Sequence, residues 1–325
     1  MTRRREKGMA AGRRLSERQR RRIAARRDER SGQERSGVII GHFGRQLEVE
    51  DASGKVVRCH ARANLPQVVT GDRVSWTPDK AEGGVVTGLE PRRNEFGRAD
   101  TSARFRPIAA NIDCVLTMFA TVPETEMSVV DRYLVAIENL GLECLLVLNK
   151  IDLPPANPRL LARMAAIYRE LELELFELSA LTGAGVNALA ERLQGLTAVV
   201  VGQSGVGKSS LLNRLGKQSL AEVGELDAWR SGGRHTTTAA RLFHLPGFDL
   251  IDSPGVREFS LGHLEPSEVV EGFVELRSLA EHCKFRDCSH RVEPGCAVLA
   301  AAENGAISGE RLRSYTRIVD SLQQA

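Results

Sequence analysis

The feature that most constrains the fold is a glycine-rich segment with the pattern G-x-x-x-x-G-K-S. Its residues are Gly202, Gln203, Ser204, Gly205, Val206, Gly207, Lys208 and Ser209, and Ser210 follows. An apolar run precedes the segment and a helical pattern follows it, which is the context in which such a loop binds phosphate. Glycines let the backbone wrap around phosphates, and the N–H groups at a helix N-terminus point at anionic oxygens. We therefore expect a nucleotide site in an α/β domain, with Lys208 at the β- and γ-phosphates and Ser209 on Mg²⁺, rather than a chance glycine-rich turn.

A second motif, N-K-x-D, indicates which base the site takes. Asn149, Lys150 and Asp152 directly follow an apolar run, so they belong at the carboxyl end of a strand, where open α/β sheets bind ligands. A carboxylate at Asp152 can accept hydrogen bonds from guanine N1–H and the exocyclic amine, and the Lys150 stem can cover the face of the base. Ser179 and Ala180 fit the supporting S-A-x loop. Each match alone could be a polar turn, but beside a phosphate loop they predict GTP and GDP as ligands.

Two further segments predict contacts to Mg²⁺ and to the γ-phosphate. Asp252 and Gly255 form D-x-x-G after an apolar strand, so Asp252 would hold Mg²⁺ through water and the Gly255 N–H would meet the γ-phosphate. The same residues could also form an ordinary Ser-Pro-Gly turn. Upstream lies the polar loop G-R-H-T-T-T, and one of its threonines should coordinate Mg²⁺ when GTP is bound. The pattern does not choose among Thr236, Thr237 and Thr238, and Thr237 stands for them in the predicted site.

The order of these motifs differs from that of ordinary GTPases, in which the phosphate loop comes first and the guanine motif comes late. Here the guanine motif precedes the phosphate loop, which precedes both other segments. A site survives such a permutation if the old termini lie close together. Alternating strand and helix patterns over 93–265 predict a doubly wound, mostly parallel sheet. One predicted helix, 128–139, carries Ser128 and Asp131 as a possible capping box.

Four residues near the C-terminus form the pattern C-x4-C-x-H-x5-C. They are Cys283, Cys288, His290 and Cys296. Three thiolates and one imidazole make a closed tetrahedral ligand set that is typical of structural zinc, so we expect one Zn²⁺ per chain and no zinc catalysis. Reduced cysteines in a loop are the alternative. The segment 266–325 is otherwise helical, and 308–322 is amphipathic, with Leu312, Tyr315, Val319 and Leu322 predicted to face inward.

The N-terminal third has two parts. Residues 36–92 show about five short strands with tight turns, which predict a small β-barrel of the OB type. Residues 1–35 contain thirteen Arg and one Lys against five acidic residues, a net charge of +9, with few large apolar residues. This arm cannot bury enough surface to fold alone, so we expect a disordered basic arm that docks on nucleic acid, with a solubilising tail as the alternative.

Composition excludes some classes of protein. Of the 325 residues, 42% are hydrophobic and 27% charged, which is ordinary for a soluble globular protein. No window approaches the roughly 18 uninterrupted apolar residues of a membrane span, and no apolar segment follows the basic N-terminus as in a secretory signal. We therefore expect a cytoplasmic protein that does not bind membranes. The cysteines outside the cluster, Cys59, Cys114 and Cys144, lie in apolar strands and should be core residues.

These motifs together resemble the circularly permuted, small ribosomal subunit-dependent GTPase A family (RsgA). The resemblance covers residues 36–325. Besides the site motifs it includes T-G-D-R-V at 70–74 and A-A-N-I-D at 109–113, which we expect to be an entry strand. It implies an OB barrel over 36–92, a permuted GTPase domain over 93–265 and a zinc domain over 266–325. It also implies binding to the 30S subunit and its 16S rRNA in late assembly, with subunit-stimulated GTP hydrolysis. We expect the protein to be a monomer.

His235 is the candidate catalytic residue. Many GTPases place a Gln after D-x-x-G to orient the attacking water, whereas this sequence has Val256, which has no polar atom for that task. A loop histidine can be swung to the γ-phosphate when a partner orders the loop, and its imidazole can accept a hydrogen bond from water. The family carries a His at this place in its G-R-H-T-T-T loop. The alternative is a histidine that only packs against rRNA.

Three other functions compete with this interpretation. A metabolic P-loop kinase or ATPase would lack the guanine motif and the zinc cluster. An RNA-binding assembly factor that uses GTP only as a structural ligand would show no subunit-dependent turnover. A permuted GTPase of the large ribosomal subunit is the nearest in kind, but the barrel and the Cys₃His segment argue against it.

Overall fold

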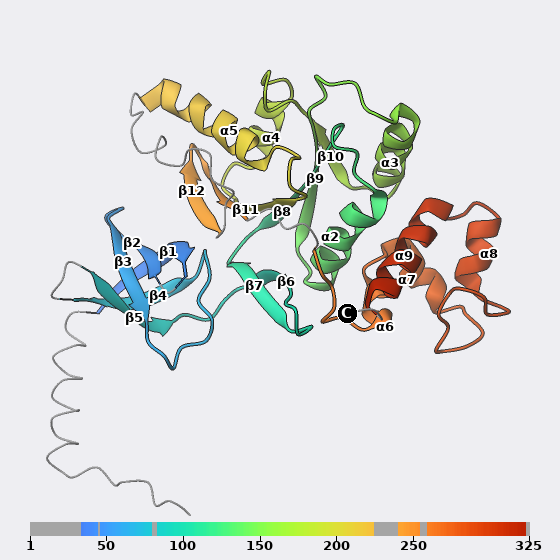
Figure 1. Cartoon of the computed structure of the whole chain (residues 1–325), viewed down its shortest axis with the longest axis horizontal. Helices are drawn as coiled ribbons and strands as arrows, with labels where there is room; N and C mark the ends of the chain where they lie inside the picture. Colours follow the sequence, from blue (N-terminus) through green and yellow to red (C-terminus); the bar gives the residue numbers. More distant parts are fainter. Residues whose placement is uncertain (1–33, 45, 80–82, 224–239, 254–258, 323–325) are drawn as a thin grey trace, which may run out of the picture.

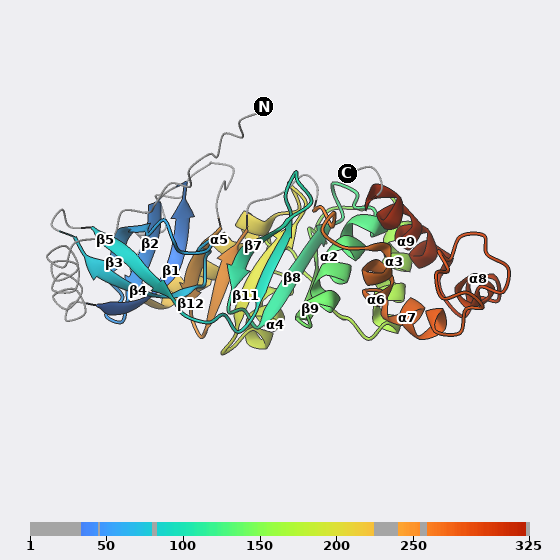
Figure 2. The ribbon, with the colours of Figure 1, turned by 90° about the horizontal axis from the view of Figure 1, so that it is seen from below.

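The computed structural model describes residues 34–44, 46–79, 83–223, 240–253 and 259–322, with the side chains of all of these except 217–223. Three parts follow one another along the long axis of the molecule: a small barrel, a central sheet with helices, and a group of helices at the far end (Figures 1 and 2). The predicted fold class is thereby confirmed. Residues 1–33 of the predicted arm over 1–35, His235, the threonines 236–238, Gly255 and Val256 lie outside the described residues.

In the described part of the N-terminal region, five strands close into a barrel. They are β1 (Arg35–Phe43), β2 (Gln46–Asp51), β3 (Val56–Ala61), β4 (Arg73–Pro78) and β5 (Gly84–Leu89). The strand order is β1-β2-β3-β5-β4, and β1 also pairs with β4, which closes the barrel. Alternate residues point inward, so Ile39, Val49 and Trp76 form part of its apolar core.

Barrel strand β1 also pairs with β12, the edge strand of the central sheet, whose strands stand in the order β10-β9-β8-β11-β13-β12. Its strands are β8 (Cys114–Ala120), β9 (Glu143–Asn149), β10 (Glu174–Glu177), β11 (Thr197–Gly202), β12 (Arg241–Leu245) and β13 (Phe248–Asp252). All neighbours are parallel except β12, which runs antiparallel to β13. Every residue of β8 is buried, as expected for a strand with helices on both faces.

Helices cover the two faces of this sheet. The helices are α2 (Met127–Asn139), α3 (Pro158–Glu170), α4 (Val186–Arg192) and α5 (Lys208–Val223). Leu116 of β8 packs in one cluster with residues of α4 and α5, whereas two other strand residues, Val115 and Phe119, join clusters with α2 and α3. The doubly wound sheet predicted from the alternating pattern is therefore present.

A hairpin that the sequence pattern did not reveal lies between the barrel and β8. It consists of β6 (Glu95–Ala99) and β7 (Phe105–Ala110). Phe96 stacks on Phe259 at 5.6 Å between ring centroids, and Phe259 lies 4.5 Å from Tyr133 of α2. The expected entry strand over 109–113 is wrong, because β7 ends at Ala110 and Asn111 turns the chain with φ of 58° before β8 begins.

The C-terminal helices are α6 (Pro266–Glu271), α7 (Val274–Ala280), α8 (Ala297–Glu303) and α9 (Gly309–Leu322). On α9, Tyr315 and Val319 are buried as predicted, but Leu312 and Leu322 are only half-buried, and the polar Ser314 and Arg311 are buried. None of the helices in the described ranges has both the length and the apolar character to cross a membrane.

The capping box expected for the helix over 128–139 is wrong. The N-cap residue is Glu126, which makes no side-chain cap bond, and both Ser128 and Asp131 lie inside α2. The Asp131 carboxylate is fully buried and pairs with Arg311 of α9, so its role is tertiary rather than local.

Candidate nucleotide site and metal centre

The sequence motifs meet at the carboxyl ends of adjacent strands. The guanine motif follows β9, the S-A-x loop follows β10, the phosphate loop connects β11 to α5, and Asp252 ends β13. In the sheet these strands stand in the order β10-β9-β8-β11-β13. Parallel strands present their carboxyl ends at one edge, so segments far apart in the chain lie at the same edge of the sheet, where ligands bind in open α/β sheets.

Lys208 lies inside the phosphate loop. Its ammonium donates to Gly202 O at 2.7 Å and to Gln203 O at 3.1 Å, and the residue is 7% exposed. Burial lowers the pKa of Lys208, while the nearby Asp252 carboxylate opposes that shift. The loop backbone is tightly packed, because a Cβ on Gly207 would lie 2.3 Å from Asn149 Nδ2. The Lys208 ammonium is thus held at the start of α5, where phosphate oxygens would bind.

Asn149 and Lys150 tie the guanine motif to the phosphate loop. Asn149 Nδ2 donates to Val206 O at 2.8 Å, and its Oδ1 accepts from the Ala180 N–H at 3.0 Å. Lys150 Nζ donates to Gly205 O at 2.6 Å and to Val122 O at 2.7 Å. Asn149 therefore joins the phosphate loop and the S-A-x loop, and the Lys150 stem crosses between the guanine motif and the phosphate loop.

The S-A-x loop is held by its own backbone and by α5. Ser179 is fully buried, and its Oγ accepts from the Thr182 N–H at 3.1 Å. Arg214 of α5 donates to Ala180 O at 2.9 Å and also to Leu181 O. No sequence motif marks Arg214, and only its position on the phosphate-loop helix could have pointed to it. Asp152, the acidic residue of the guanine motif, is exposed.

The described part of the predicted Mg²⁺ site consists of Ser209 and Asp252. Asp252 is 4% exposed at the end of β13, and the neighbouring Ser253 donates from Oγ to Val200 O at 2.6 Å, which fixes the strand end against β11. A hydroxyl and a carboxylate are hard oxygen ligands, which is the donor chemistry that Mg²⁺ prefers. The donor set therefore fits this ion. The third predicted Mg²⁺ ligand, Thr237, lies outside the described residues, as do Gly255, predicted at the γ-phosphate, and the candidate catalytic residue His235.

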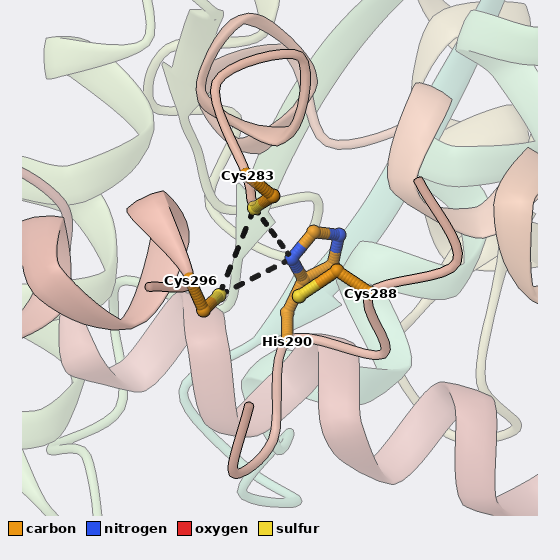
Figure 3. A group of neighbouring side chains, drawn as sticks. All are labelled: Cys283, Cys288, His290 and Cys296. Carbon is orange, nitrogen blue, oxygen red and sulfur yellow. Dashed lines mark hydrogen bonds between the residues drawn. The ribbon is translucent and has the colours of Figure 1, made fainter. Parts of the chain in front are cut away.

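The four C-terminal Cys and His side chains converge on one point (Figure 3). Cys283 Sγ lies 3.8 Å from Cys296 Sγ and 3.5 Å from His290 Nδ1, and Cys296 Sγ lies 3.4 Å from the same nitrogen. All four ligand atoms, including Cys288 Sγ, are within 4.8 Å of one another. A tetrahedral zinc with ordinary bond lengths requires about 3.8 Å between sulfurs and about 3.6 Å between sulfur and nitrogen. The cluster therefore fits a four-coordinate metal ion.

The chain around the cluster orders its ligands. Cys296 is the N-cap of α8 and accepts from the Leu299 N–H at 3.4 Å. Burial works against ionisation of the Cys283 thiol, but hydrogen bonds from the backbone of Ala297 and Val298 and with the side chains of Cys296 and Cys288 together lower its pKa. Glu293 accepts from the backbone of Ser289, Arg291 and Val292, and these hydrogen bonds hold the turn that carries His290. Glu293 is a supporting residue that the metal-ligand spacing did not reveal.

A phosphate loop, a guanine motif and Asp252 of D-x-x-G, brought to one edge of a sheet in permuted order, define a circularly permuted GTPase. The family model for the RsgA GTPase matches residues 89–262, more than half of the chain. The chain therefore belongs to the RsgA GTPase family and is a GTP hydrolase.

Individual relatives match nearly the whole chain. The small ribosomal subunit biogenesis GTPase RsgA of Azotobacter vinelandii is 49% identical and aligns over 90% of this chain and 87% of its own length. The protein of the same name from Pseudomonas aeruginosa (strain LESB58) is 47% identical, and the alignment covers 93% of this chain and 92% of that protein. The crystal structure of YjeQ from Thermotoga maritima superposes with a TM-score of 0.69 at 31% sequence identity; the match covers 90% of this chain and 99% of that one. The structure of YloQ, described as a circularly permuted GTPase, superposes with a TM-score of 0.64 at 26% sequence identity and covers 90% of this chain and 96% of its own.

Proposed function

We propose that this GTPase acts in late assembly of the 30S ribosomal subunit and hydrolyses GTP to GDP and phosphate with stimulation by that subunit. The observation that carries the proposal is the combination, in one chain, of the convergent guanine-nucleotide motifs with a barrel and a Cys₃His centre. Relatives that match about nine-tenths of the chain are named for biogenesis of the small subunit. We place the protein in the cytoplasm as a monomer.

The decisive experiment is GTP turnover with purified subunits. We expect slow hydrolysis by the protein alone, strong stimulation by 30S subunits and little by 50S subunits. Stimulation by 50S alone would favour a large-subunit factor, and no stimulation by either would favour a factor that uses GTP structurally. Equal binding of ATP and GTP would refute the assignment of the base.

Each residue named in the proposed nucleotide site would have one role. Asp152 accepts from the guanine N1–H and amine, Lys208 neutralises the β- and γ-phosphates, and the loop from Gly202 to Ser210 surrounds them. Ser209, Asp252 and Thr237 would hold Mg²⁺, which when bound neutralises charge that develops between the β- and γ-phosphates. The Gly255 N–H would contact the γ-phosphate.

His235 is the proposed catalytic residue, and Val256 supports this because it leaves D-x-x-G without a water-orienting side chain. We expect His235→Ala to retain GTP and 30S binding but to lose subunit-stimulated turnover on the order of 10²-fold, the usual contribution of a positioned base. Single-turnover hydrolysis on 30S subunits measures this. Near-wild-type hydrolysis by the variant would assign the missing group to the ribosome.

The zinc centre and the basic arm are assigned to structure and to RNA binding. A closed Cys₃His set leaves no position for substrate, so Zn²⁺ would stabilise the fold around Cys283, Cys288, His290 and Cys296. The arm over 1–35 would bind 16S rRNA phosphates through its net charge of +9. Deleting it should flatten the salt dependence of 30S binding by roughly one slope unit for each phosphate that the arm neutralises. An unchanged slope would assign the arm to solubility.

A further inference from the structure

A row of paired residues crosses the sheet from the barrel to the predicted Mg²⁺ carboxylate. Barrel strand β1 lies beside β12 (Figure 2), and Gly41 of β1 pairs with Arg241 of β12. On its other side Arg241 pairs with Asp252 of β13, and Asp252 pairs in turn with Val200 of β11. Adjacent strands stand about 4.8 Å apart, so only about 10 Å separates the backbone of the barrel from that of Asp252.

Thr70, which lies between β3 and β4 of the barrel, holds the start of β12. The residue is 1% exposed, and its Oγ1 donates to the carbonyl oxygen of Ala240 at 2.9 Å, directly before β12 begins. Ala240 is buried in the same apolar cluster as Ile40 of β1. A buried carbonyl needs a hydrogen-bond partner, so the Thr70 hydroxyl fixes the place at which β12 begins.

The hydroxyl is itself held in place, because the backbone around Thr70 is bonded on both sides. Thr70 O accepts from the Ala110 N–H at 3.0 Å, which joins it to the hairpin of β6 and β7. The Gly71 N–H donates to Ile39 O at 2.8 Å, and the Ile39 N–H donates to Asp72 O at 2.9 Å, which joins the segment to β1. The Thr70 hydroxyl is thus a donor whose position is set by the barrel and the hairpin.

The contact falls at the end of the β12–β13 hairpin that matters for the nucleotide site. Arg241 begins β12 and Asp252 ends β13, so the two residues form the open end of the hairpin, where pairing frays unless other contacts hold it. On the β11 side, the N–H and Oγ of Ser253 both donate to Val200 O. On the β12 side, the barrel holds the open end through Thr70 and the pairing with β1.

We propose that Thr70 is a positioning residue for the Mg²⁺ site: by holding the start of β12, it keeps the Asp252 carboxylate where it can hold the ion. This inference rests on the proposed guanine-nucleotide site and its Mg²⁺. Because β11 holds β13 on the other side, loss of the Thr70 hydroxyl should loosen Asp252 rather than displace it. The barrel thus takes part in the nucleotide site through β12.

The test measures how much Mg²⁺ the protein needs in order to retain GDP. Release of a fluorescent GDP is followed over a series of Mg²⁺ concentrations for wild type, Thr70→Val and Thr70→Ser. Valine has nearly the shape of threonine but no hydroxyl, so Thr70→Val should raise the half-saturating Mg²⁺ concentration roughly three- to tenfold. This is below the roughly 10- to 100-fold usual for direct partners of a metal ligand, since Thr70 acts through the backbone. Thr70→Ser keeps the hydroxyl and should stay close to wild type.

Two further variants calibrate the measurement. Glu50→Ala removes the barrel's contact with His244, which lies further along β12, away from the open end of the hairpin. It breaks a barrel contact to the same strand, so it should leave the Mg²⁺ dependence unchanged. Asp252→Asn removes the charge of the proposed ligand and should raise the half-saturating concentration more than either Thr70 variant.

A measurement on the wild type keeps the inference testable if Thr70→Val does not fold. Coupling between two sites is reciprocal, so Mg²⁺ held by Asp252 should in turn stabilise the segment around Thr70. With GDP present, adding Mg²⁺ should slow amide exchange at Gly71 and Ala110, whose N–H groups hold that segment. Exchange should not change in β3, which pairs with β2 and β5.

The outcomes separate failure of this inference from failure of the proposed function. Wild-type release of GDP that does not depend on Mg²⁺, or an Asp252→Asn variant that behaves as wild type, refutes the Mg²⁺ site itself. A normal Mg²⁺ dependence in Thr70→Val, with Asp252→Asn impaired, refutes only the inference. An equal shift in Glu50→Ala would show that any loosening of the barrel has this effect and that Thr70 has no particular role. Unchanged exchange at Gly71 and Ala110 also contradicts the inference.

Discussion

The two junctions that flank the central sheet are built differently. On the C-terminal side, α2 packs against α6 and α9, and these helices share one apolar cluster with the sheet residues Val199 and Ile251. Arg311 of α9 is buried in this interface, 2.5 Å from Asp131 of α2 and 2.6 Å from Glu275 of α7. The C-terminal helices and the GTPase sheet therefore have a common core.

On the other side, the barrel has its own core and touches the sheet mainly through polar groups. Gly41 of β1 pairs with Arg241 of β12, and Thr70 Oγ1 donates to Ala240 O at 2.9 Å. His244 of β12 lies 2.6 Å from Glu50 of the barrel. Ile40 is a barrel residue that reaches the shared cluster.

The contrast indicates which contacts survive a change of conditions. Buried apolar groups carry no charge that salt could screen or pH could titrate, whereas exposed polar pairs are screened and titrate. We expect the C-terminal helices to unfold together with the GTPase sheet and the barrel to respond as a separate unit.

Metal removal is the largest expected perturbation, and it tests whether the common core is real. Binding of structural zinc supplies roughly 10 kcal/mol to folding in small sites, so chelation should unfold the cluster region. Because the core is shared, amide exchange should also rise in α2 and α9 but not in β2–β5, whose residues lie outside that core. Elemental analysis should find one zinc per chain.

A matched pair of variants controls this experiment. Cys288→Ser should reproduce the chelated exchange pattern, whereas His282→Asn, which alters an exposed histidine next to Cys283, should not. Protein purified without chelators that contains no zinc would contradict the assignment. Exchange that rises equally in the barrel would show that the two junctions are not different.

Loss of the buried Asp131–Arg311 ion pair should have the next largest effect on stability. Arg311→Leu leaves the carboxylate of Asp131 buried and without its cation, and such a change costs about 3–5 kcal/mol. Arg277→Leu is the control, since it breaks an exposed pair with Glu138 that joins α7 to α2 in the same junction, and such pairs contribute about 0–1 kcal/mol. Urea denaturation measures both. Equal losses for the two variants would mean that burial is not what distinguishes this junction.

Local chemistry explains which of these features could be predicted from the sequence. Lys208, Asp152 and the Cys₃His ligands belong to short sequence motifs, so their spacing in the sequence was enough to predict the sites they would form. Arg214 and the Asp131–Arg311 pair could not be predicted, because their partners lie about 30 to 180 residues away and no local pattern encodes such contacts.

Two motifs shared with the family, T-G-D-R-V and A-A-N-I-D, were given no ligand or catalytic role from the sequence, but they have a structural role at the barrel junction. Asp72 of T-G-D-R-V is fully buried and accepts from the Val69 N–H and from Arg92. Gly71 has φ of 90°, and a Cβ there would lie 2.1 Å from Ala110 O. Asn111 of A-A-N-I-D donates from Nδ2 to Gly71 O at 2.9 Å. These motifs connect the barrel to the hairpin, and only the structure reveals that they meet.

The smallest expected effect lies at the barrel junction and depends on pH. His244 lies between two carboxylates, Asp249 at 2.7 Å and Glu50 at 2.6 Å, with a second pair, Arg241–Glu48, beside it. The hydrogen bond to Asp249, and then that to Glu50, outweigh partial burial and raise the pKa of His244 to about 9. Since the folded-state pKa is raised, the stabilisation is fully present below about pH 6.5 and is lost as the pH rises through about 9.

Its magnitude should be modest, because the His244 side chain is 54% exposed and solvent screens the pairs. A contribution of about 1 kcal/mol or less is expected, well below that of the buried pair on the other side. The measurement is a double-mutant cycle of His244→Gln and Glu50→Gln by urea denaturation at pH 6 and pH 10. We expect a coupling free energy at pH 6 that vanishes at pH 10. Coupling that persists at pH 10 would show that the junction is held by the neutral imidazole rather than by its charge, and the barrel junction would then be as indifferent to pH as the C-terminal one.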